Sequence, residues 1–242
     1  MMQVNISRSL QRRQGGAVVL IMLLILIMGS AYVLLTTLNK GDPRQPRLLA
    51  TVQDINAVRD ALIGYSITHG DCLPCPDSTG DGLAQATCVG ATPAAGWLPW
   101  ITLGLGAEDP WGRRLRYLVD PDFTDSGGGC GMTQSKPAAI RVRIRDAAGN
   151  LVVHIPETPA VVISHGPNGF GATSADGSAL ANPPAAHVDE ETNRSATNDL
   201  VQRATSADSA IVGGPYDDLV TWVPLGGLKD QLARVNGGSL PP

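Results

Sequence analysis

A long apolar stretch near the N-terminus constrains this chain more than any other feature of its sequence. No charged residue occurs between Gly15 and Asn39, and most residues of the stretch are aliphatic. As a helix, about 22 residues span roughly 33 Å, which matches a bilayer hydrocarbon thickness of about 30 Å. Arginines precede the stretch and place its N-terminal end in the cytoplasm: Arg8, Arg12 and Arg13. We therefore expect one membrane-spanning helix over 17–39, with residues 40–242 on the far side.

An alternative interpretation of the same stretch is a cleaved secretory signal peptide. The apolar core of a signal peptide usually has about 7–15 residues, fewer than this stretch contains. No small-x-small cleavage site follows the stretch, because Gly29-Ser30-Ala31 lies inside it. The pattern favours a helix that stays in the membrane.

The remaining 40–242 segment is long enough for one domain with a real core. The net charge of −4 does not indicate a nucleic-acid partner. The 28 glycines and 18 prolines predict a domain rich in loops. Aromatic residues are few, so we expect Trp97, Trp100 and Trp111 to supply bulk to its core.

Periodicity in 40–242 predicts an α+β fold. Two prolines near 41–46 should break the first helix, and a second helix should follow. Its apolar residues recur at spacings of three and four: Leu48, Val52, Ile55, Val58, Leu62 and Tyr65. We expect this helix to end near His69 and a loop to run from 72 to 99.

Short β-rich stretches predict a small antiparallel sheet and a closing helix. The expected strands are 115–119, 139–144, 151–155, 161–164 and 219–223, and the expected helix is 225–235. Between the second and third strands, Gly149 and Asn150 should take positive φ in a hairpin turn. Residues 171–214 are polar and small, so we expect a long surface excursion there.

Four motifs in this order resemble the type IV pilins and the pseudopilins of type II secretion. They are Arg12-Arg13-Gln14-Gly15-Gly16 before the apolar helix, the second helix with its loop, Asp109-Pro110-Trp111-Gly112 with Leu115 and Tyr117, and Ser164-His165-Gly166 with Asp217-Asp218 and Trp222. The resemblance implies a pilin-like fold, in which a long N-terminal helix packs on an antiparallel sheet. It also implies a leader, residues 1–16, that a prepilin peptidase removes before methylating Ala17. The cut would follow Gly16, or Gly15.

The same resemblance implies a structural subunit of a type II secretion pseudopilus or a type IV pilus. Its expected partners are other pilins or pseudopilins, the prepilin peptidase and the bacterial inner membrane, with the globular domain in the periplasm. The sequence departs from the family at the fifth mature position, where glutamate is usual and Ile21 stands here, or Leu20 with the other cut. This departure predicts a minor subunit at the filament tip.

The resemblance also implies a calcium site in the periplasmic domain. In the major pseudopilin, the S-x-G loop and an acidic pair enclose calcium, and the matching positions here are Ser164, Asn168, Asp217 and Asp218. Calcium takes six to eight oxygen ligands, which suits a glycine-rich loop facing carboxylates. The alternative is a hydrogen-bonded turn beside a solvated acidic pair. A weaker calcium candidate is Asp77 with Asp81, spaced like the start of an EF-hand loop, for which a plain turn is the alternative.

Four cysteines lie in the exported part: Cys72, Cys75, Cys88 and Cys130. An even number in an oxidising compartment favours two disulfides over a zinc or redox site, which would need reduced thiols. The spacing alone does not choose among the three pairings. Of these we favour Cys75–Cys88, which closes the loop, with Cys72–Cys130 tying the helix end to the sheet.

The sequence shows no catalytic constellation, so we expect no enzyme activity. Its four histidines lack metal-ligand spacing, and the glycines after Ser164 are in the wrong order for a dinucleotide loop. The alternative function is a single-span inner-membrane protein with a periplasmic binding domain that never enters a filament. A second rival, an exported hydrolase, lacks a nucleophile and base pair.

Overall fold

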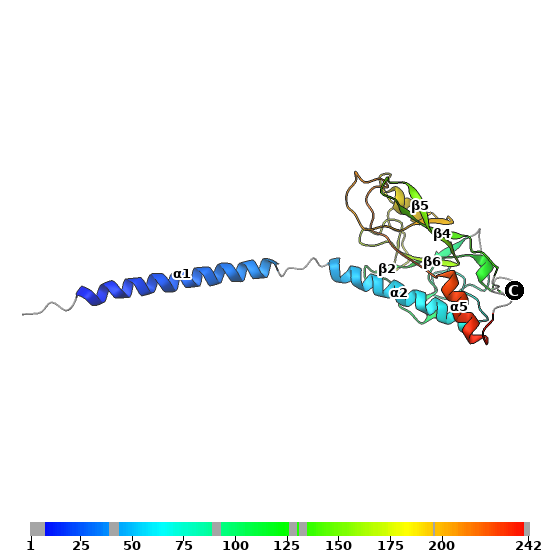
Figure 1. The fold of residues 1–242 in the computed structure, drawn as a ribbon, viewed down its shortest axis with the longest axis horizontal. Coiled ribbons are helices and arrows are strands. Elements are labelled where there is room, and N and C mark those ends of the chain that lie inside the picture. The colour runs from blue at the N-terminus through cyan, green and yellow to red at the C-terminus, as the bar shows by residue number, and fades with distance from the viewer. Residues whose placement is uncertain are drawn as a thin grey trace, which may run out of the picture. The chain divides into compact units, whose positions relative to one another are not determined.

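The computed structural model describes residues 8–38, 44–88, 93–125, 130, 135–195 and 197–239. The chain divides into two compact units, 1–45 and 46–242 (Figure 1). In the first unit, α1 is one helix over Arg8–Leu38. Its segment Gly16–Thr36 is long and apolar enough to span a membrane, and every side chain of that segment is exposed. The predicted break at 41–46 lies partly outside the described residues, and α2 begins at Arg44.

The second helix, α2 (Arg44–Thr68), buries one face against the domain core. Of the predicted apolar stripe, Ile55, Val58 and Leu62 are buried, but Val52 is 41% exposed. The buried line continues instead through Thr51 and Ser66. Both hydroxyls donate to carbonyl oxygens of their own helix, Arg47 O and Ile63 O, which lets small polar side chains enter the core. The stripe was therefore predicted correctly in its centre and wrongly at Val52.

The core is built around a four-stranded antiparallel sheet with the order β1-β3-β6-β9. Its strands are β1 (Ala94–Trp97), β3 (Arg116–Val119), β6 (Ala160–Ser164) and β9 (Leu219–Trp222). Side chains alternate between its two faces. On one face Tyr117, Val119 and Val162 join α2 and the last helix, α5 (Leu225–Val235), in the larger hydrophobic cluster. The strands β3, β6 and β9 and helix α5 match the predicted elements, whereas β1 falls in the stretch predicted as a loop.

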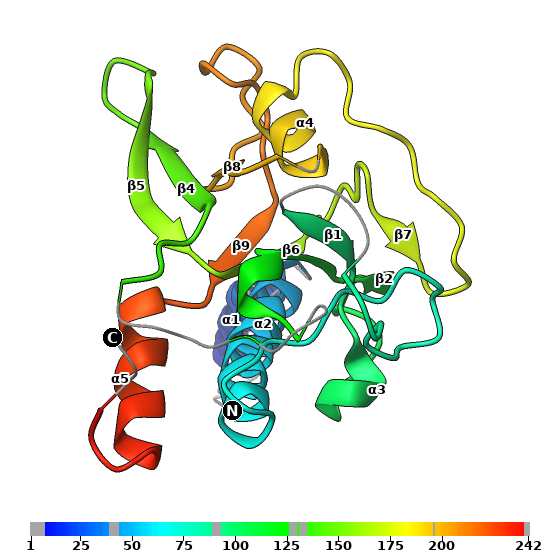
Figure 2. The same ribbon diagram turned by 90° about the vertical axis from the view of Figure 1, so that its right-hand side faces the viewer.

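A second sheet covers the other face, which carries Leu118, Val161 and Ile163 (Figure 2). It has three strands in the order β5-β4-β8: β4 (Ile140–Arg145), β5 (Leu151–Thr158) and β8 (Asp199–Val201). β4 pairs with β8 in parallel, so the fold is not purely antiparallel. In the β4–β5 turn Gly149 has φ 85°, but Asn150 does not take positive φ. The Asp146 carboxylate instead accepts the Asn150 backbone N–H at 2.8 Å.

The predicted surface excursion over 171–214 is wrong as a description of the whole segment. It contains β7 (Thr173–Ser174), α4 (Val188–Arg194) and the buried strand β8. Its apolar side chains are few, but Leu200 and Val201 are fully buried. Asn193 supports them by donating to Val201 O at 2.9 Å while its own Oδ1 accepts the Val201 N–H. A short buried strand held by a polar side chain leaves almost no periodic signal in the sequence.

The tryptophans do not fill the core as expected. Trp97, Trp100 and Trp111 are all only half-buried, and the largest fully buried side chains are Tyr117, Tyr216 and Phe123. The guanidinium of Arg114 lies 5.0 Å from the rings of both Trp97 and Trp100, near the short helix α3 (Trp100–Leu103). Arg114 also belongs to β2 (Arg113–Arg114), which pairs with β7. These rings hold arginines at the surface by cation–π contact.

Two disulfides join the loops to the core. The structure pairs Cys75 with Cys88 and Cys72 with Cys130, the pairing favoured from the sequence. Among the described residues there is no free cysteine. The Cys72 bridge ties the end of α2 to a segment beyond η1 (Pro121–Phe123), and Leu73 N–H bonds Phe123 O at 2.8 Å beside it. The bridges thus hold a polar, glycine-rich loop against the helix and sheet.

Candidate metal centre

The loop that follows β6 brings the S-x-G motif to the acidic pair before β9. Gly166 has φ 52°, and a Cβ there would lie 2.1 Å from the carbonyl oxygen of Asp217. A side chain at this position would therefore collide with the backbone that carries the acidic pair. Further along the loop, Asn168 N–H donates to Asp217 Oδ2 at 2.9 Å. The close approach of two backbones explains why glycine is needed here.

Three carboxylates meet at this point, because α4 contributes Glu190 to the pair Asp217 and Asp218. One ligand atom of each lies within 4.8 Å of one ligand atom of the others. The side chains of Glu190 and Asp218 are 0% and 1% exposed, respectively. Three carboxylates that are this close and largely out of water repel one another unless protons, hydrogen bonds or a cation compensate.

Hydrogen bonds compensate two of these carboxylates. Glu190 Oε1 accepts from Asn168 Nδ2 and from the backbone N–H of Asp217, both at 2.9 Å, and its Oε2 lies 2.7 Å from His187 Nδ1. Asp218 Oδ2 accepts from Asn193 Nδ2 at 2.9 Å. These contacts fix the positions of Glu190 and Asp218 without using every lone pair of their carboxylate oxygens.

Asp217 is different, because its Oδ1 is buried and has no hydrogen-bond donor within the described part of the chain. Burial raises the pKa of this carboxyl group to about 7, with a further rise from the charges of Glu190 and Asp218. The N–H of Asn168 and the charge of Arg113 oppose the rise without cancelling it. An acceptor oxygen without a donor, beside two other carboxylates, fits a divalent cation that takes oxygen ligands.

The structure assembles part of the ligand set predicted from the sequence. Asn168, Asp217 and Asp218 come together, but Ser164 turns away and donates from Oγ to Asp109 Oδ2 at 2.6 Å. Asp109 also accepts the backbone N–H groups of Trp111 and Arg113. Ser164 therefore anchors the Asp109-Pro110-Trp111-Gly112 turn to β6, which is a structural role.

Glu190 was missed because it lies in the segment interpreted as a surface excursion. Its only signal in the sequence is the acidic run Asp189-Glu190-Glu191, which resembles a solvated helix start. Asp189 is in fact buried and paired with Arg145 at 2.6 Å. Only the placement of α4 on the loop after β6 turns Glu190 toward the acidic pair.

The weaker calcium candidate is a hydrogen-bonded turn. Asp77 is buried, and its two carboxylate oxygens accept the backbone N–H groups of Thr79, Gly80 and Gly82 at 2.7–2.9 Å. Asp81 is exposed and accepts the N–H of Leu83. Carboxylate oxygens engaged by several N–H donors have little left for a cation, so this geometry favours the turn interpretation.

Comparisons with models of protein families, with curated proteins and with solved structures found no match. The calcium hypothesis therefore stands on the three carboxylates and the unpaired Asp217 Oδ1, together with the motif resemblance.

The raised pKa of Asp217 gives a pH dependence that tests the cluster without added cation. Its pKa is about 7 in the folded chain and near 3.8 when unfolded, so folding favours the protonated form. The extra stability is fully present below about pH 4 and is lost as pH rises to about 7. In the presence of a chelator, the parent should lose stability over that window relative to Asp217→Asn, by urea unfolding at each pH. Parallel curves for the two proteins would contradict this assignment.

Calcium should reverse the loss, because it binds the ionised carboxylates. At a hundredfold excess over the dissociation constant, binding stabilises the folded state by about 2.7 kcal/mol. We expect a rise in melting temperature at pH 8 that is smaller at pH 5.5 and absent in Asp217→Ala, Asp218→Ala. The matched control is Asp81→Asn, which removes an exposed carboxylate of the weaker candidate and should keep the full response. A response lost in Asp81→Asn alone would move the site to that loop.

Proposed function

We propose that this chain is a pilin-like structural subunit, processed by a prepilin peptidase and assembled at low copy number into a type II secretion pseudopilus or a type IV pilus. The observation that supports this most is α1. It is a continuous helix whose segment Gly16–Thr36 exposes every side chain and directly follows Arg12-Arg13-Gln14-Gly15. An apolar helix with this exposure needs a bilayer or neighbouring helices around it.

The second unit supports the same proposal through its layout. A helix, α2, packs by one face on an antiparallel sheet, and two disulfides suit an oxidising compartment such as the periplasm. The carboxylate cluster at the loop after β6 also fits this proposal, because it contains the acidic pair of the motif that resembles the pseudopilins. The alternative, a single-span inner-membrane protein with a periplasmic binding domain, shares the helix and the disulfides but not the leader cleavage.

Leader cleavage therefore separates the two functions. Coexpression with a prepilin peptidase should remove Met1 to Gly16 and add one methyl group at Ala17, as measured by intact-mass spectrometry. Because the peptidase must accommodate the residue before the cut, Gly16→Leu should block this cleavage, while Gly15→Leu serves as the matched control and should leave it intact. The reverse result would place the cut after Gly15. A parent chain that remains unprocessed beside an active peptidase would remove the pilin proposal in favour of the alternative.

A further inference from the structure

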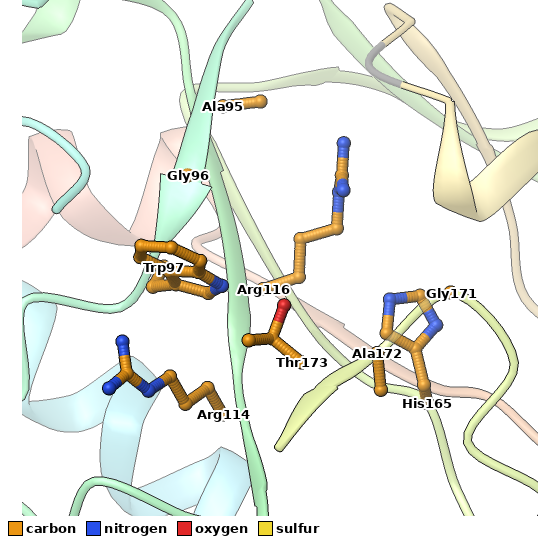
Figure 3. A pocket seen from close by; sticks show the side chains of 9 residues that line it. All are labelled: Ala95, Gly96, Trp97, Arg114, Arg116, His165, Gly171, Ala172 and Thr173. Atoms are coloured by element: carbon orange, nitrogen blue, oxygen red, sulfur yellow. The ribbon is translucent and has the colours of Figure 1, made fainter. Parts of the chain in front are cut away.

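A cavity of about 250 Å³ lies at the end of the sheet face that packs against the three-stranded sheet. Arg116 of β3 enters it from the position opposite Ile163 of β6. Figure 3 shows Trp97 and Arg114 on one side of this space, and His165 on the opposite side. The residues that line the cavity combine positive charge with small side chains: Ala95, Gly96, Trp97, Arg114, Arg116, His165, Gly171, Ala172 and Thr173.

Arg116 has no partner for its charge within the described part of the chain. Its Nε is buried and makes no hydrogen bond there. Burial, and next the charge of Arg194, lower the pKa of Arg116 from its usual value, against an opposing effect of Asp218. An arginine remains protonated in proteins, so this half-buried charge is kept at a cost. The Nε of Arg114 is likewise buried without a partner among the described residues, but its guanidinium stacks on two tryptophans and donates from Nη2 to Ala175 O at 3.1 Å.

His165 contributes an unpaired polar atom of a different kind. Its side chain is 1% exposed, and Nδ1 lies 3.2 Å from Asp218 Oδ1. Because a carboxylate accepts, Nδ1 is the ring nitrogen that donates to Asp218, and in the neutral tautomer with this hydrogen Nε2 is an acceptor. Nε2 is buried and has no hydrogen-bond partner among the described residues. The cavity thus presents a cation and a hydrogen-bond acceptor, both without partners.

We propose that this cavity binds a small oxyanion that also carries a hydroxyl hydrogen, of which hydrogen phosphate is the simplest member. The guanidinium of Arg116 donates to the ionised oxygens, and Nε2 of His165 accepts the hydroxyl hydrogen. The chemistry predicts selectivity, because sulfate at neutral pH has no hydrogen to donate. A lone pair on Nε2 then faces an acceptor oxygen and weakens binding.

The test is isothermal titration of the full-length protein in detergent at constant ionic strength, with a chelator present so that calcium takes no part. Inorganic phosphate should bind about tenfold more tightly than sulfate, since one well-placed hydrogen bond has this value. Trp97 lines the cavity, so its fluorescence gives a second readout of the same titration.

Three variants locate the binding. Arg116→Gln should weaken phosphate binding by about 10- to 100-fold, because it removes a charge-assisted contact. Arg234→Gln, at an exposed position in α5, is the matched control and should bind like the parent. His165→Gln can offer an amide N–H to the cavity, so its preference for phosphate over sulfate should shrink or reverse.

Circular dichroism should verify that each variant is folded before it is titrated. Arg116→Lys, which keeps the charge, should retain part of the affinity if Arg116→Gln fails to fold. No heat or fluorescence change with phosphate would overturn the proposal, as would equal affinity for phosphate and sulfate in the parent. Unchanged phosphate affinity in a folded Arg116→Gln protein would overturn it as well.

Discussion

Replacing Cys72 and Cys130 together with alanine is expected to lower the free energy of unfolding by about 4 kcal/mol. The bridge closes a loop with a sequence separation of 58 residues, and the chain entropy that it removes from the unfolded state grows with loop length. Domains of this size are stable by about 5–15 kcal/mol, so the variant should lose a large share of its stability. Urea unfolding of the oxidised parent and the variant measures the difference.

The second bridge supplies an internal control for the same measurement. Cys75–Cys88 closes a shorter loop, with a separation of 13, so its removal should cost about 3 kcal/mol. Both variants replace two cysteines with alanines, which makes the chemistry of the change comparable. A loss below about 1 kcal/mol for the Cys72 variant would contradict the entropic account. Free thiols in the denatured, unreduced parent would contradict the bridges themselves.

If the chain is the filament subunit proposed above, replacing Ile21 with glutamate is expected to raise its incorporation along the filament shaft several-fold. In the pilins that the leader resembles, glutamate at this position neutralises the N-terminal amine of a neighbouring subunit inside an apolar core. A buried amine without a partner costs several kcal/mol. Within Gly16–Thr36 this chain has no acidic residue, and Ile21 exposes its side chain on α1. The parent subunit should therefore occur at the tip, in few copies.

Quantitative blotting of sheared filaments measures this effect against the major subunit. Ile21→Gln is the matched control, because it adds a polar side chain of similar size without a negative charge. We expect Gln to behave like the parent and Glu to enter the shaft. Abundant shaft incorporation of the unmodified protein would defeat the tip assignment, and equal gains for Gln and Glu would attribute the effect to polarity rather than charge.

The α+β class and most of the regular elements were predictable from local pattern. The apolar run of α1, the spacing of Ile55, Val58 and Leu62 in α2, and the β-rich stretches of β3 to β6 each carry a periodic signal. Such signals arise wherever one face of an element is buried against apolar neighbours. They do not arise for β1, a short strand with glycine and alanine at its centre, or for the polar surroundings of β8.

The candidate metal centre was only half predictable, because its parts come from segments far apart in the chain. Asp217 and Asp218 are adjacent in the sequence and follow a motif, whereas Glu190 reaches them from α4. Ser164 fits the motif but is bonded to Asp109, which the sequence alone does not reveal. The choice of hydrogen-bond partner depends on distances set by packing, so no local pattern reports it.

The sequence by itself determined the membrane-compatible helix, because about twenty consecutive apolar residues form a helix long enough to cross a bilayer. It also determined that the four cysteines suit an oxidising compartment. Only the tertiary structure decided which charges are left without partners. Both Arg114 and Arg116 line the cavity, but Arg114 also stacks on two tryptophan rings and donates to Ala175 O, whereas Arg116 has no ion pair or hydrogen bond among the described residues. The sequence does not distinguish these two arginines. Their surroundings differ because one ends β2 and the other begins β3, and because the loop after β6 places His165 at the cavity.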